Sequence, residues 1–188
     1  MITWDAWLGG ATLQPTPVAV TDNGDAAEPA SQLPRLRVAL EVGTQPSPTA
    51  SAHVAVSGTV WRGEWALDLP YDALTWEAGV DLVLRGWVPV TAPGTRARPF
   101  ADVAIGGRMV GLEQPWWADE TRGGISLRLG AGVAVGTDSR RVQAAVRYEA
   151  VGAGLARVGT LESAAQDMTW TWTPSGGRLW VEVGAGLR

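Results

Sequence analysis

Apolar and polar residues alternate with a period of two along most of the chain. In the segment 35–42, the aliphatic residues Leu36, Val38, Leu40 and Val42 are separated by Arg37, Ala39 and Glu41. Successive side chains of a β-strand point to opposite faces, so this pattern predicts a strand with one apolar and one polar face. We expect the four aliphatic residues to share one face. The alternation does not say whether that face meets a protein core or lipid.

The same alternation recurs at intervals typical of all-β domains. It is found in the further segments 2–8, 54–60, 65–71, 80–84, 103–105, 125–135, 142–148, 168–172 and 179–187. We therefore predict an all-β fold, an antiparallel β-sandwich or β-barrel of about ten strands with long loops. The only helix that the sequence suggests is a short one near 161–166.

The chain is expected to form a single β domain over residues 1–188. Within it, the segment 15–34 is rich in Pro, Ala, Asp and Glu, and we predict an extended arm or loop that a neighbouring subunit orders. Turn-forming residues predict tight hairpins at Arg62-Gly63 and at 174–177, and a slightly longer turn at 136–139. Residues 92–99 and 114–124 are expected to form the other two long loops.

Composition narrows the function classes. The chain has 188 residues, no Cys, and 15 basic residues that are all Arg, with a formal net charge of -4. The absence of Cys excludes disulfides, thiolate nucleophiles and zinc–cysteine sites. A weakly acidic chain argues against binding to nucleic acid or to an anionic membrane surface, because either would require a basic face. We see neither a signal peptide nor an apolar run of transmembrane length.

Candidate chemistry is sparse. His53 is the single histidine, and a metal site or a catalytic triad normally needs several such groups. We interpret it as a surface or satisfied structural residue. The same-parity carboxylates Asp68/Asp72 and Glu77/Asp81 are interpreted as a solvated strand face rather than a glycosidase pair. We therefore predict no catalytic residue, no metal, no cofactor and no enzymatic activity.

Trp116 and Trp117 stand out because two adjacent indoles in a polar loop must point in different directions. Tryptophan is enriched at interaction hot spots, so we predict that at least one of the two contacts another subunit. The alternatives are a loop that plugs the end of its own core, and a platform on which a sugar stacks.

The chain resembles virion structural proteins of bacteriophages with high-GC hosts, in the tail or decorating the head. The resemblance lies in the overall composition and layout of the chain. These combine an initial Met without a signal, no Cys, no Lys, 11 Trp and a Pro-rich arm beside a β domain. It implies a non-enzymatic assembly component, located in the virion, whose partners are other protein subunits. The first alternative is a bacterial outer-membrane β-barrel, because segments such as 125–135 and 178–187 have the alternation of barrel strands. The second is a carbohydrate-binding β module.

Overall fold

The computed structural model describes residues 2–13, 18–20, 26–27, 29–32, 35–65, 72–89, 97–113, 120–137, 139–151, 157–162, 167–172 and 176–187. Almost all of them lie in β-strands. Among these residues, no helix is long and apolar enough to cross a membrane.

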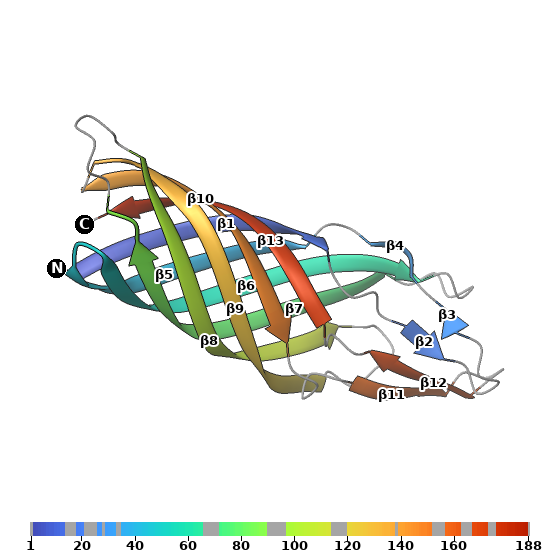
Figure 1. Cartoon of the computed structure of the whole chain (residues 1–188). Helices are drawn as coiled ribbons and strands as arrows, with labels where there is room; N and C mark the ends of the chain where they lie inside the picture. Colours follow the sequence, from blue (N-terminus) through green and yellow to red (C-terminus); the bar gives the residue numbers. More distant parts are fainter. Residues whose placement is uncertain are drawn as a thin grey trace.

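Eight long antiparallel strands form a closed barrel (Figure 1). They are β1 (Ile2–Leu13), β5 (Leu36–Ser47), β6 (Ala50–Trp65), β7 (Asp72–Trp87), β8 (Ala97–Glu113), β9 (Glu120–Gly136), β10 (Arg140–Val151) and β13 (Gly176–Leu187). Each strand pairs with the next of this list, β13 pairs with β1, and the β6–β7 ladder completes the circle. Closure leaves no unpaired edge in the barrel wall, which is the usual solution to the edge-strand problem.

The two ends of the barrel differ, because the two longest connections between strands, residues 14–35 and 152–175, lie at the same end. The chain termini and the turns β5–β6, β7–β8 and β9–β10 lie at one end, which we call the turn end (Figure 1). At the other end, the long-loop end, the strands are joined by residues 14–35, 66–71, 114–119 and 152–175. The predicted turn at 136–139 is confirmed, and Gly136 supports it with a φ of 142°, a conformation that favours glycine.

Short strands extend the structure at the long-loop end. β2 (Val18–Val20), β3 (Ala26–Ala27), β11 (Arg157–Glu162) and β12 (Asp167–Trp172) form a separate four-stranded sheet in the order β11-β12-β2-β3. β4 (Pro29–Gln32) pairs with the end of β6. Parts of the predicted arm at 15–34 therefore lie in strands, and its dependence on a neighbouring subunit stays a prediction.

The count of about ten strands was too high for the barrel, and no sandwich is formed. The segment 168–172 is a strand, but it belongs to the small outer sheet. Arg62-Gly63 is not a turn, because β6 runs through it and pairs these residues with Leu74 and Ala73. The predicted helix near 161–166 is also wrong where the structure describes it, since Leu161 and Glu162 end strand β11.

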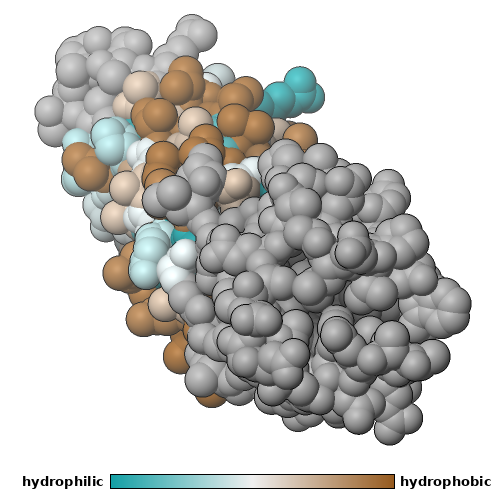
Figure 2. Space-filling model, turned by 90° about the vertical axis from the view of Figure 1, so that its right-hand side faces the viewer, coloured by the Kyte–Doolittle hydropathy of each residue, from teal (hydrophilic) through white to brown (hydrophobic). Residues whose placement is uncertain are grey.

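The alternation of the strands is confirmed, but the apolar face is the outer one. Leu36, Val38 and Leu40 are exposed, whereas Arg37 and Glu41 are buried inside the barrel. The same holds around the wall, where large apolar side chains from all eight strands are exposed. Seen from the long-loop end, the part of the wall that is visible is mostly hydrophobic (Figure 2). Among the exposed strand residues that the structure describes, only Arg140 carries a charge.

Candidate functional site: the polar interior of the barrel

Among the described residues that are fully buried inside the barrel, positive and negative side chains are equal in number. Every one of them is at most 5% exposed in the described structure. The buried arginines are Arg35, Arg37, Arg85, Arg108, Arg128, Arg147 and Arg178, and the buried carboxylates are Asp5, Glu41, Glu77, Asp81, Asp102, Glu149 and Glu182. Seven charges of each sign leave the set electrically neutral, which is the condition under which many charges can be buried together.

The network begins near the turn end with Arg85 of β7. Its guanidinium donates to Asp5 of β1 at 2.7 Å and to Glu41 of β5 at 2.6 Å. Asp5 also accepts hydrogen bonds from Gln143 at 2.8 Å and Arg141 at 2.7 Å. These contacts join strands that are far apart in the sequence.

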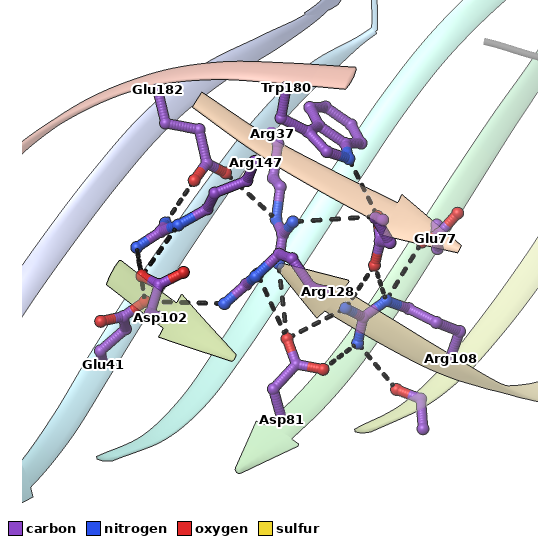
Figure 3. A network of polar contacts seen from close by, with 12 residues as sticks. Arg37, Glu41, Glu77, Asp81, Asp102, Arg108, Arg128, Arg147, Trp180 and Glu182 are labelled. Atoms are coloured by element: carbon purple, nitrogen blue, oxygen red, sulfur yellow. Dashed lines mark hydrogen bonds and ion pairs between the residues drawn. The ribbon is translucent and has the colours of Figure 1, made fainter. Parts of the chain in front are cut away.

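Arg147 of β10 holds the middle of the barrel. It donates to Asp102 of β8 at 2.7 Å and to Glu182 of β13 (Figure 3). Glu182 thereby ties β13 to its neighbour β10 on the inner side of the wall, while Asp102 reaches Arg147 over Gly130 of the intervening strand β9. The charge-assisted bonds are of the stronger kind, because both partners are ionised.

Toward the long-loop end, Arg108 of β8 makes a bidentate contact with Asp81 and directs two N–H groups to a single oxygen, Oε1, of Glu149. Its guanidinium donates to Asp81 at 2.6 and 3.0 Å and to Glu149 at 2.6 and 2.9 Å (Figure 3). The Trp180 indole also donates to Glu149, at 2.9 Å. Arg178 adds a further pair with Glu77 at 2.6 Å.

Arg37 and Arg128 lie between these groups and are held more loosely. Arg37 is 3.5 Å from Asp81, and Arg128 is 3.4 Å from the same carboxylate. Both guanidinium groups point toward Asp81 in the centre of the view in Figure 3. Asp81 therefore serves three arginines and connects the middle of the network to its long-loop side.

Glycines on the inner face provide the space that the long side chains need. A Cβ at Gly79 would lie 2.9 Å from Cζ of Arg108, and a Cβ at Gly130 would lie 2.6 Å from Cγ of Arg147. Such distances are shorter than real carbon contacts, so a larger residue would displace the arginine. The glycines let the arginines lie flat across the wall.

An aromatic cluster lines the interior near the turn end. Trp7, Trp87 and Phe100 are buried there, and their rings pack with centroids 5.2 and 6.2 Å apart. Arg85 lies over the Phe100 ring at 4.9 Å, and Arg147 over the Trp7 ring at 4.1 Å. The ion-pair network thus continues into a packed aromatic layer through cation–π contacts.

Asp5, Glu41 and His53 are close enough to be considered as metal ligands, because their ligand atoms lie within 4.8 Å of one another. However, the Arg85 guanidinium already bridges the two carboxylates. Asp5 is in addition fully engaged with Arg141 and Gln143. A bound cation would have to displace a fixed positive charge, so this group does not fit a metal.

The comparisons with known proteins point to one architecture. No protein-family model and no curated protein matches the sequence. The fold is that of small outer-membrane barrels. The outer membrane protein OprG from Pseudomonas aeruginosa matches with a TM-score of 0.62 and 9% identity, over 100% of this chain and 95% of that one. Neisserial surface protein A matches with a TM-score of 0.54 and 13% identity, over 99% and 96%. Identities this low show the shared fold alone.

These findings overturn the assignment to a bacteriophage virion, both as a family resemblance and as a location. The composition and layout on which the resemblance rested are common to β-rich proteins from high-GC genomes. No sequence motif supported the virion interpretation. The similar structures are outer-membrane barrels instead. Partnership with other protein subunits stays a prediction.

The structure places the candidate residues of the sequence as follows. Trp116 and Trp117 lie outside the described residues, so their role at an interface stays a prediction. His53 is not a surface residue, because it is buried inside the barrel and neither ring nitrogen has a hydrogen-bond partner among the described residues. Glu77 and Asp81 are not a solvated face, since both are buried and paired with arginines.

Most of the interior network escaped the sequence analysis. The signal that could have found it is the recurrence of both Arg and acidic residues at the polar positions of the alternating strands. In a soluble protein these residues would have to face water.

Proposed function

We propose that this chain is a bacterial outer-membrane β-barrel, with its outer wall in lipid and its long-loop end on the extracellular side. The observation that carries the proposal is the inverted polarity of the wall, with buried ion pairs inside and aliphatic side chains outside. In water, the exposed apolar side chains would oppose folding, because large contiguous apolar surfaces are rare on soluble monomers. In a bilayer the same wall is matched to its solvent, and a closed barrel satisfies every backbone hydrogen bond of the wall.

The outward aromatic residues support this placement. Trp4 is exposed near the start of β1, at the turn end. Tyr148 is exposed near the end of β10, and Trp76 lies on the outer face near the start of β7, both toward the long-loop end. Between these two levels the outer wall is aliphatic, as at Val54, Leu82 and Ile105. Membrane barrels carry aromatic residues at both interfaces and aliphatic residues between them.

We further propose that the barrel works as a rigid, non-enzymatic anchor for its long-loop end rather than as an open pore. Eight strands enclose an interior only wide enough for side chains to fill. Here the interior is occupied by ion pairs, among them Arg178 of β13 with Glu77 of the opposite strand β7, and by the layer of Trp7, Trp87 and Phe100. These groups link opposite strands and would resist any widening of the barrel.

The test is insertion of the purified chain into lipid. Refolded with phospholipid vesicles, the protein should float with the vesicles in a density gradient and resist alkaline extraction. It should also migrate differently on a denaturing gel with and without boiling, because a folded barrel stays compact in detergent. A chain that is monodisperse in water without detergent would contradict the membrane proposal. A steady, large conductance in planar bilayers would contradict the anchor and favour a pore.

A further inference from the structure

Among the described residues, the barrel wall at the turn end carries one charged residue that faces outward. Arg140 begins strand β10, and its side chain is exposed. The turn before it is fixed, because Thr137 donates its amide to the Arg140 carbonyl at 2.8 Å, and the Arg140 amide donates to the Thr137 hydroxyl at 3.1 Å. Within the described structure the Arg140 guanidinium makes no hydrogen bond and no ion pair.

Arg140 is the end of a row that crosses three strands. In the register of the sheet, Trp4 of β1 lies opposite Leu187 of β13, and Leu187 lies opposite Arg140 of β10. Trp4 and Leu187 are each 55% exposed, so all three side chains stand on the outer wall. Neighbouring strands are about 4.8 Å apart, which places Trp4 and Arg140 about 10 Å from one another.

The other described arginines of this end are engaged on the inner side of the rim. Arg141 is bonded to Asp5, and its guanidinium lies 5.2 Å from the centre of the Trp87 ring. Arg98 donates to the Pro48 carbonyl at 2.6 Å and lies over the same ring at 5.1 Å. Arg140 alone of these three therefore offers its guanidinium to what surrounds the barrel.

We propose that the Trp4–Leu187–Arg140 row binds the headgroup of an anionic phospholipid at the membrane interface of the turn end. The inference rests on the proposed function, because it needs the outer wall to lie in lipid. A guanidinium presents a fork of donors that matches the oxygens of a phosphate, and an indole sits at the headgroup level with its N–H toward the polar side. Leu187 and the neighbouring Val142, both exposed, would contact the first methylenes of the acyl chains.

Charge also favours an anionic lipid. Among the described residues of the strands, Arg140 is the only exposed charge on the outer wall, so no acidic side chain of the described wall offsets it. The seven buried arginines and seven buried carboxylates of the interior cancel one another and add no net negative charge beside it. A zwitterionic headgroup brings its own cation to the site, whereas phosphatidylglycerol brings only the phosphate. The row should therefore prefer phosphatidylglycerol over phosphatidylcholine.

The experiment is native mass spectrometry of the full chain released from nanodiscs that contain equal amounts of the two lipids. The wild-type barrel should retain phosphatidylglycerol in about fivefold excess, the factor that corresponds to about 1 kcal/mol for one arginine at an anionic surface. Arg140→Gln should abolish the excess, and Arg140→Lys should keep most of it. Arg98→Gln is the matched control, because it removes one positive charge from the same end on the inner side, and it should keep the excess.

The outcomes separate this inference from the proposal on which it rests. If the wild-type barrel inserts but retains both lipids equally, or if Arg140→Gln retains the excess, the lipid site is refuted and the membrane barrel stands. If the chain does not enter nanodiscs at all, both are refuted.

Discussion

The inner and outer faces of the same eight strands obey opposite rules. Inside, Arg108 meets Asp81 and Glu149 in fixed, charge-assisted hydrogen bonds. Outside, Val54, Leu82 and Ile105 stand side by side with no directional contact. The contacts of the inner face fix how the strands are arranged around the barrel. The side chains of the outer face determine which surroundings, water or lipid, the barrel is suited to. The difference shows that the inward-facing and outward-facing residues of one strand can serve separate purposes, the first in internal contacts and the second in matching the surroundings.

The difference also predicts how each face responds to substitution. Removing one member of a buried ion pair leaves an uncompensated charge in a medium of low polarity, so the inner face should be sensitive to loss. The outer face has no such partners, and it should be sensitive only to the introduction of charge. Four substitutions test this contrast, in order of decreasing expected effect.

The largest effect is expected for Arg147→Met. The change leaves Asp102 and Glu182 buried without their shared cation, although the side chain volume is nearly conserved. We expect a loss of about 3–5 kcal/mol in the free energy of unfolding, measured by urea titration in lipid vesicles with tryptophan fluorescence. The double variant with Glu182→Gln should recover part of the loss. A loss below about 1 kcal/mol would mean that the interior is hydrated well enough to screen the charges.

The next effect is expected for Leu82→Arg on the outer wall. Leu82 lies opposite Val54 and Ile105, all three more than half exposed, midway between the aromatic levels. An arginine there should cost about 2–4 kcal/mol, because its charge would enter the hydrocarbon. Leu82→Met is the control and should change little. Equal stability of the two variants in vesicles would argue that this wall meets water or protein rather than lipid.

A smaller loss of stability is expected when glycine is replaced by alanine, and it should differ between the inner and outer faces. Gly79→Ala places a methyl group against the Arg108 guanidinium, whereas Gly58→Ala on the outer face meets nothing within 4 Å. We expect a loss of about 1–3 kcal/mol for the inner change, because the arginine must move out of its contacts with Asp81 and Glu149. The outer change should stay within about 0.5 kcal/mol. The same urea titration measures both, and similar values for both would contradict the packed interior.

The smallest effect is expected for His53→Leu. Neither ring nitrogen of this buried histidine has a hydrogen-bond partner in the described structure, so an apolar side chain of similar size removes no interaction. The free energy of unfolding should change by less than about 1 kcal/mol. A larger loss, or a loss that depends on an added divalent cation, would show that His53 acts together with Asp5 and Glu41 after all.

The sequence predicted the faces correctly but not which of them turns inward. Leu36, Val38 and Leu40 share a face, as the alternation with Arg37 and Glu41 required. An alternation with a period of two distinguishes the two faces of a strand, but it does not show which face points into the barrel. The interpretation of Glu77 and Asp81 as solvated followed from assuming that the polar face meets water. The arginines that pair with them come from other strands, Arg178 of β13 and Arg108 of β8.

The number of strands was harder to predict than their pattern. Barrel strands are long because they are tilted, and β6 alone spans Ala50–Trp65, across residues that resemble a turn. In addition, β12 in the long-loop region has the same alternation as a barrel strand, with Trp170 and Trp172 on one parity. Local propensity cannot tell these cases apart, because ring closure depends on pairing between segments far apart in the chain.

The most direct test of the central claim uses the absence of native cysteine. Val56, Leu82 and Ile105 are each replaced by a single cysteine, which is labelled with a nitroxide, and the protein is placed in vesicles. The collision rate of each nitroxide is then measured with oxygen, which concentrates in lipid, and with a water-soluble nickel chelate. The account predicts high oxygen and low nickel accessibility at all three positions. High nickel accessibility would place the wall in water, and low accessibility to both reagents would place it against protein; either result would contradict a membrane barrel.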